Sequence, residues 1–150
     1  MALKDTIQND TKAALLSGNR FVADTLRNLK AAILNEEVAQ GKRGEGLTDQ
    51  EIEKIISREV KKRNESIVLY TQNARNDLAE IEQNEVDVLS RYLPEQLSEE
   101  EIRKIVQAKI AEIDTPSIQA MGSVIGAVKQ QLGSSADGSV IAKVVKETLS

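Results

Sequence analysis

The C-terminal part of the chain reads MGSVIGAVKQQLG (121–133), SSADG (134–138) and SVIAKVVKETL (139–149). Apolar residues in the first and third segments recur at helical spacing, and the second segment is rich in turn residues. This order predicts a helix, a turn and a second helix. Gly133 suits the left-handed position that follows a helix end, and Asp137 suits the cap of the last helix.

Two glycines lie four residues apart inside the first of these helices. Gly122 and Gly126 each cost about 1 kcal/mol relative to alanine in a helix interior, so a compensating role is expected. One alternative is close packing against a neighbouring helix, and the other is a backbone surface open to a partner. The apolar stripe beside these glycines consists of Ile118, Met121, Ile125, Val128 and Leu132.

The composition limits the classes of protein to which this chain can belong. Its 150 residues suffice for one sizeable core, or for one core and a small satellite domain. Hydrophobic residues make up 40% of the chain and aromatic residues only 2%, so the core must be aliphatic. The net charge of −4 argues against a strongly basic nucleic-acid binder, but it is compatible with a local basic face.

Cysteine and histidine are both absent from the chain. Disulfides, thiol nucleophiles, histidine bases and Cys/His metal sites are therefore excluded. The acidic run Glu99–Glu101 is interpreted as a favourable first turn of a helix rather than as a magnesium cluster. We predict no catalytic residue, no metal and no cofactor, and no enzymatic activity of the chain on its own.

The sequence also bears on the cellular location. No apolar run approaches the roughly 20 residues of a membrane-spanning helix. Asp5 and Asp10 are acids of the kind that secretory and mitochondrial targeting segments avoid. We therefore expect a cytoplasmic protein that does not bind membranes.

Helical periodicity runs through the N-terminal part of the chain. Gly18 separates the first two expected helices, and Thr48 with Glu51 forms a capping box for a long third helix. Pro94 stops the fourth helix and marks the expected domain boundary. The four helices are expected at about residues 2–17, 19–39, 48–74 and 77–92.

The segment GKRGEG (41–46) carries three glycines between the second and third helices. This density of glycine predicts a mobile, solvated linker. Lys42 and Arg43 make phosphate binding an alternative, but the segment lacks the Walker pattern of Gly-Lys-Ser/Thr after a strand.

The region after Pro94 is expected to form three helices. Ser98 and Glu101 make a second capping box, and Thr115–Pro116 is expected to start the middle helix. No strand-like alternation is found anywhere in the sequence. We predict an all-α fold with a four-helix N-terminal domain at 1–93 and a small three-helix C-terminal domain at 94–150.

Two sets of basic residues are candidates for contact with RNA phosphates, and a solvated helix face is the alternative for both. Folded RNA is read by shape and backbone contacts. Single-stranded RNA binding depends on aromatic stacking, and the aromatic residues here fall on inward stripes. The inward aromatic residues are Phe21, Tyr70 and Tyr92, and the two basic sets are Arg58, Lys61 and Lys62, and Lys129, Lys143 and Lys146.

Arg63 differs from its basic neighbours because it falls inside the apolar stripe of the third helix. It either extends its guanidinium outward to water or meets a carboxylate. If the third and fourth helices form a hairpin, Glu82 or Glu85 can reach it.

Several segments carry a family resemblance. The C-terminal stretches MGSVIGAVK (121–129), GSSADGSV (133–140) and VKETL (145–149) resemble the end of the YqeY proteins. LRNLKAAI (26–33), EVKKR (59–63) and YLPEQLSEEEI (92–102) extend this resemblance over nearly the whole chain. The last third to half of the chain is also similar, more loosely, to the tail of the GatB subunit of the glutamine-dependent aminoacyl-tRNA amidotransferase.

The resemblance implies a GatB/YqeY-like division into two helical parts. In the amidotransferase the tail helps to hold tRNA, while amidation takes place elsewhere, so no catalytic residue is carried over. The first functional hypothesis is a non-catalytic tRNA-binding module. The second is a protein adaptor that docks through Gly122 and Gly126 onto an amidotransferase or an aminoacyl-tRNA synthetase. The third hypothesis is an accessory to carbon–nitrogen ligation with glutamine as amide donor. DNA is not an expected partner.

Overall fold

The fold was analysed in a computed structural model that describes residues 2–150. These residues form seven α-helices and two short 3₁₀ turns, and they contain no strand. The prediction of an all-α protein is therefore confirmed. The chain divides into two compact units, of which the first ends at Leu93 and the second begins at Pro94.

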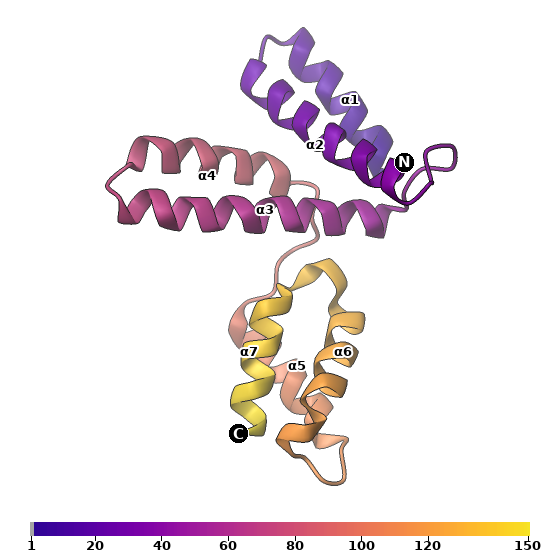
Figure 1. The fold of residues 1–150 in the computed structure, drawn as a ribbon, viewed down its shortest axis with the longest axis vertical. Helices are drawn as coiled ribbons and strands as arrows, with labels where there is room; N and C mark the ends of the chain where they lie inside the picture. The colour runs from indigo at the N-terminus through magenta and orange to yellow at the C-terminus, as the bar shows by residue number, and fades with distance from the viewer. Residues whose placement is uncertain (1) are drawn as a thin grey trace. The chain divides into compact units, whose positions relative to one another are not determined.

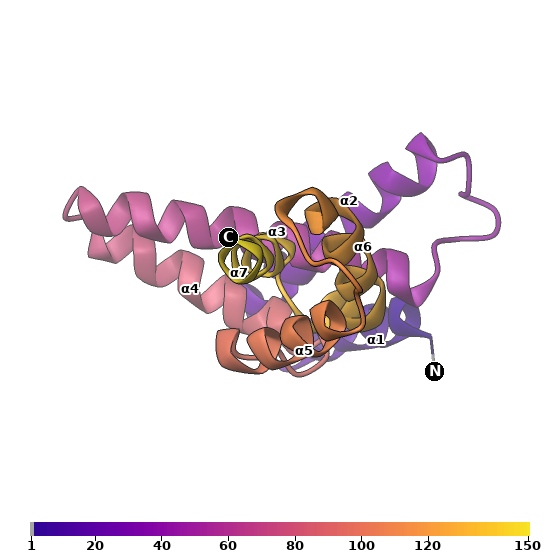
Figure 2. The ribbon, with the colours of Figure 1, turned by 90° about the horizontal axis from the view of Figure 1, so that it is seen from below.

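The first unit consists of two helical hairpins. In one hairpin α1 packs against α2, and in the other α3 packs against α4; Figure 1 shows both pairs, and Figure 2 shows α3 and α4 side by side from below. The aliphatic core between the hairpins includes Leu26, Ile52 and Leu89. The helices are α1 (Leu3–Leu16), α2 (Arg20–Ala39), α3 (Asp49–Gln72) and α4 (Asn76–Ser90).

Local sequence signals set the ends of these helices. The capping box at the start of α3 is confirmed, because the Thr48 hydroxyl accepts a bond from the Glu51 N–H and the Glu51 carboxylate accepts one from the Thr48 N–H. Gly18 has a φ of 78° between α1 and α2, a conformation that glycine adopts without strain. Ala74, at the end of the expected third helix, instead lies in the turn after α3 with a φ of 57°.

The predicted inward stripes are only partly buried. Phe21, expected on an inward stripe, is 40% exposed, so that assignment is wrong. Ile81, 48% exposed, and Val38, 60% exposed, also lie on the surface. Tyr92 is half-buried, and its hydroxyl donates to Asp10 Oδ2 at 2.6 Å. Helical spacing places a residue on a face, but it does not determine whether another helix covers that face.

The glycine-rich segment 41–46 is tied back to its neighbours. The Lys42 N–H donates to the Glu37 carbonyl at 2.8 Å, and the Gly46 N–H donates to the Lys42 carbonyl at 2.7 Å. The Lys42 ammonium lies 3.3 Å from the Glu51 carboxylate. Phosphate binding in this segment would depend on two cations, and one of them, Lys42, is held in an internal ion pair.

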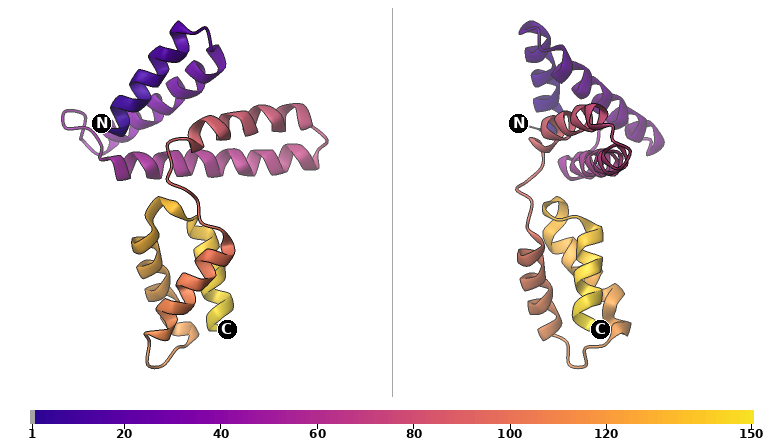
Figure 3. Two further views of the ribbon diagram at one scale, coloured as in Figure 1. Left: turned by 180° about the vertical axis from the view of Figure 1, so that it is seen from behind. Right: turned by 90° about the vertical axis from the view of Figure 1, so that its left-hand side faces the viewer.

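The second unit is a three-helix arrangement, which Figure 3 shows from two sides. Its helices are α5 (Glu99–Ala111), α6 (Met121–Leu132) and α7 (Gly138–Leu149). Both α5 and α6 contact α7, around a core that is again aliphatic. The fully buried core residues include Ile102, Val106, Val124, Val128, Ile141 and Val144.

The signals around the middle helix of this unit are confirmed only in part. The predicted start at Pro116 is wrong, because Ser117 is extended (φ −153°, ψ 166°) and a 3₁₀ turn at Ile118–Ala120 precedes α6. Gly133 has the expected positive φ, 53°. The Asp137 carboxylate caps α7 by accepting a bond from the Ser139 N–H at 2.8 Å.

Candidate nucleic-acid and partner surfaces

The basic set on α3 is exposed but partly neutralised. The Arg58 guanidinium is 67% exposed at 3.9 Å from Glu36, and the Lys62 ammonium lies 3.3 Å from Glu59. Lys61 is exposed and forms no ion pair within residues 2–150. Such solvated pairs are weak, so the three cations remain available to a phosphate backbone.

Arg63 is separated from this exposed set. Its Nε donates to Glu85 Oε2 at 2.8 Å, and its Nη1 donates to the Glu59 carbonyl at 3.1 Å. The side chain is only 15% exposed. The hypothesis that Arg63 meets a carboxylate of the fourth helix is confirmed for Glu85, and Arg63 is a structural residue of the α3–α4 hairpin.

Glu82 lies near this pair without a direct bond to Arg63. Burial raises the pKa of the Glu82 carboxyl, and the neighbouring Glu85 carboxylate raises it further, while Arg63 opposes both effects. The hairpin therefore holds more carboxylates around Arg63 than the guanidinium can neutralise.

In the second unit, Lys143 belongs to a chain of ion pairs between α5 and α7. Its ammonium lies 3.0 Å from Glu99 Oε1, while Arg103 lies 3.7 Å from the same carboxylate and 2.9 Å from Glu147. Glu99 raises the pKa of the Lys143 ammonium, and Arg103 lowers the pKa of Glu147. Lys143 must break or share this network before it can bind a phosphate.

Lys129 and Lys146 differ from Lys143 in their ion pairing. Both are exposed, and neither forms an ion pair within the described part of the chain. The Lys129 side chain passes over the start of α7, where a Cβ on Gly138 would come within 3.0 Å of the Lys129 Cε. Gly138 thus leaves room for this lysine at the junction of α6 and α7.

Gly122 and Gly126 lie on the exposed face of α6. A Cβ built at either position meets no atom within 4 Å. Close packing against another helix of this chain therefore does not account for them. Ile118, which was expected in the buried stripe, is 50% exposed just before this glycine-bearing face.

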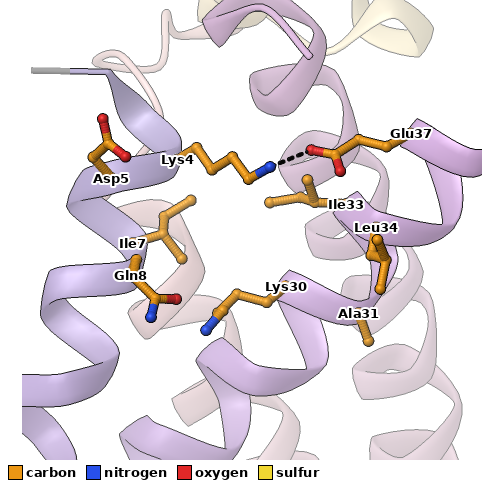
Figure 4. A pocket seen from close by; sticks show the side chains of 9 residues that line it. All are labelled: Lys4, Asp5, Ile7, Gln8, Lys30, Ala31, Ile33, Leu34 and Glu37. Carbon is orange, nitrogen blue, oxygen red and sulfur yellow. Dashed lines mark hydrogen bonds and ion pairs between the residues drawn. The ribbon is translucent and has the colours of Figure 1, made fainter. Parts of the chain in front are cut away.

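A pocket between α1 and α2 was not foreseen from the sequence. Its volume is about 400 Å³, and Figure 4 shows the side chains around it. The Lys4 ammonium donates to the Glu37 carboxylate at 2.6 Å, and the Glu37 side chain is 3% exposed. A signal was present, because Glu37 follows Leu29 and Ile33 at helical spacing and so stands in the buried stripe of α2.

Residues 2–150 contain no cluster of three or more acidic side chains that could hold a metal ion. None of the helices described is both long and apolar enough to cross a membrane.

The fold and these surfaces define an all-α protein of two helical units, with its candidate sites on exposed basic and glycine-bearing faces. The chain belongs to the YqeY family, since the profile of the family described as Yqey-like protein matches residues 4–149. The recognition made from the sequence is thereby confirmed.

Curated relatives come from fungi and bear the name "Altered inheritance of mitochondria protein 41, mitochondrial". The protein of Clavispora lusitaniae is 31% identical over 138 residues, which cover 89% of this chain and 78% of that protein. The protein of Pyrenophora tritici-repentis is 28% identical over 148 residues, covering 95% of this chain and 78% of that protein. In Lachancea thermotolerans the identity is 30% over 118 residues, with 75% and 62% covered.

Proposed function

We propose that this chain is a non-catalytic module that associates with tRNA through its C-terminal unit. Residues 121–149 resemble the GatB tail, and that resemblance is the reason for choosing tRNA over other folded RNAs. We include a cytoplasmic location in the proposal, whereas the names of the fungal relatives place those proteins in mitochondria.

The observation that carries the proposal is that Lys129 and Lys146, within the stretch that resembles the GatB tail, are exposed and form no ion pair in residues 2–150. Lys104 of α5 is also exposed and without an ion pair in these residues, but it lies outside that stretch. Unpaired ammonium groups bind phosphates without first breaking an internal ion pair. Lys143 is held by Glu99 at 3.0 Å, so we assign it a smaller contribution. Arg58, Lys61 and Lys62 on the first unit are kept as a possible second contact.

The overall charge of −4 opposes long-range attraction of an RNA. Affinity must then come from a few close contacts. A site that neutralises about two phosphates gives a log–log salt slope of about −2 with the coefficient for duplexes, and a shallower slope with that for single strands.

The test is a titration of the full chain with folded tRNA at several salt concentrations. We expect weak binding, and we expect the double variant Lys129→Glu/Lys146→Glu to abolish it. Lys104→Glu is the matched control, because Lys104 is an exposed lysine on α5 of the same unit. Lys143→Gln should weaken binding less than Lys146→Gln.

Two results separate the possible outcomes of this titration. Full affinity in the double variant moves the site to Arg58, Lys61 and Lys62. No binding by the wild-type chain at tens of micromolar protein and roughly 50 mM salt rejects the tRNA proposal.

A second candidate function is supported by Gly122 and Gly126. The open space at both glycines fits an adaptor that presents bare backbone to a protein partner. The proposed partners are an amidotransferase or an aminoacyl-tRNA synthetase, and in the first case the chain would be an accessory to carbon–nitrogen ligation with glutamine as amide donor. Apolar docking of this kind depends weakly on salt, which distinguishes it from binding to phosphates.

A further inference from the structure

The pocket between α1 and α2 has an aliphatic floor. Ile7 of α1 and Ile33, Leu34 and Ala31 of α2 form this floor, and all of the lining residues belong to these two helices. Figure 4 shows the pocket open between the two helices. None of the lining residues is aromatic, so the pocket offers no stacking surface to a nucleobase.

Exposed apolar side chains extend this surface beyond the pocket. Five of the nine large hydrophobic side chains exposed in the described residues belong to α1 and α2. Val38 follows Leu34 by four residues, and Leu15 follows Gln8 by seven, so each shares a helical face with a pocket residue. We call the pocket together with the exposed apolar side chains of Leu15, Leu34 and Val38 the α1–α2 groove.

The charged side chains at the groove differ in whether they form ion pairs. The Lys4–Glu37 pair at 2.6 Å neutralises itself at one end of the pocket. The Lys30 ammonium forms no ion pair in the described residues and points across the pocket toward α1 in Figure 4. The Asp5 carboxylate lies at the same end of the pocket as Lys4 and also lines it.

Lys12 follows the pocket residue Gln8 by four residues and so shares its face of α1. Lys12 is exposed and has no ion-pair partner in the part of the chain described. Arg27 lies 3.6 Å from Asp24, and both side chains are more than half exposed. An occupant with acidic side chains therefore gains charge partners at Lys30 and Lys12.

We propose that the α1–α2 groove binds an acidic amphipathic α-helix of a partner protein. Aliphatic side chains of that helix, spaced three and four residues apart, pack on Ile33, Leu34 and Val38, and a carboxylate pairs with Lys30. An antiparallel pair of helices offers the ridges and grooves against which a third helix packs. Recognition of an amphipathic helix in an apolar groove is a recurrent mode of protein binding. This surface is distinct from the RNA site proposed above.

The experiment is a selection of displayed helical peptides on the full chain, followed by binding measurements with the purified peptides. We expect enriched peptides to carry an aliphatic stripe with Asp or Glu beside it. Leu34→Asp and Lys30→Glu should each weaken their binding about tenfold or more, as for residues central to an interface. Leu69→Asp and Lys54→Glu are matched controls on exposed positions of α3 and should leave binding unchanged.

A charge exchange makes the test specific for Lys30. A peptide whose acid is replaced by lysine should lose affinity for the wild-type chain and regain it for Lys30→Glu. Circular dichroism of each variant checks that the helices are retained.

Several results would overturn the proposal. No enriched peptide, or peptides that bind Leu34→Asp as tightly as wild type, would exclude the groove as a helix site. Self-association that Leu34→Asp abolishes in sedimentation would make a second copy of the chain the occupant. Displacement of the enriched peptides by micromolar decanoate but not by decanol would indicate a site for a free aliphatic carboxylate.

Discussion

Arg63 and Glu85 join α3 to α4 through a hydrogen bond of 2.8 Å between Arg63 Nε and Glu85 Oε2. The arginine also bonds to the Glu59 carbonyl at 3.1 Å, so its guanidinium is held from both helices of the hairpin. Since the Arg63 side chain is 15% exposed, the burial of this ion pair is intermediate between that of a surface pair and that of a fully buried pair.

Arg63→Ala should lower the free energy of unfolding by roughly 1–3 kcal/mol, between the values typical of exposed pairs and of buried pairs that lose one partner. Lys61→Ala, on the exposed face of the same helix, should change it by less than about 0.5 kcal/mol. Chemical denaturation of both variants measures the difference. Equal and small effects would return Arg63 to the candidates for RNA contact.

Glu82→Gln should stabilise the chain at neutral pH. Burial and Glu85 raise the pKa of the Glu82 carboxyl in the folded state, so the folded chain binds that proton more tightly than the unfolded chain does. The free energy of unfolding therefore falls as the pH rises from the ordinary pKa of a glutamate through the raised pKa of Glu82 in the folded state. The glutamine variant removes this loss, and its advantage in melting temperature should vanish at a pH below the ordinary glutamate pKa. An advantage of the same size at all pH values would mean that charge is not its cause.

Gly126→Ala should raise the stability of the second unit by about 1 kcal/mol, because alanine is the better helix former and its Cβ meets no atom within 4 Å. Gly133→Ala is the opposite control, since Gly133 has a φ of 53° that alanine adopts only with strain. Thermal unfolding of both variants gives the comparison. If the Gly126→Ala variant is more stable but no longer binds a partner that the wild type binds, Gly126 is required for that binding rather than for the stability of the fold.

Thr48→Ala should cost about 1 kcal/mol, because it removes the hydroxyl that accepts a bond from the Glu51 N–H at the start of α3. Thr71→Ala is a suitable control, as Thr71 is exposed and its hydroxyl bonds only to the Ile67 carbonyl within the same helix. Urea denaturation of the two variants tests whether the capping box stabilises the hairpin. A cost for Thr71→Ala equal to that for Thr48→Ala would contradict this.

Several local signals led to correct predictions, because the interactions involve residues close in the sequence. The capping box of Thr48 and Glu51, the cap at Asp137 and the glycine conformation at Gly133 all depend on a few adjacent residues. For Arg63 the sequence left two alternatives open, water or a carboxylate of the fourth helix at Glu82 or Glu85, and the structure selects Glu85. The predicted helix start at Pro116 was wrong. Ser117 adopts an extended conformation, so a helix cannot run on from Pro116.

By itself, the sequence determined the all-α class, the aliphatic core, most helix ends and the family, because periodicity, capping and motif identity are encoded in residues near one another. Only the tertiary structure decided which faces are covered: it left Phe21 and Ile81 exposed, paired Lys143 with Glu99, left Lys146 without an ion pair in residues 2–150 and opened space around Gly122. Those outcomes depend on how distant helices pack, since a helical face is buried, or a charge neutralised, only when another element lies against it.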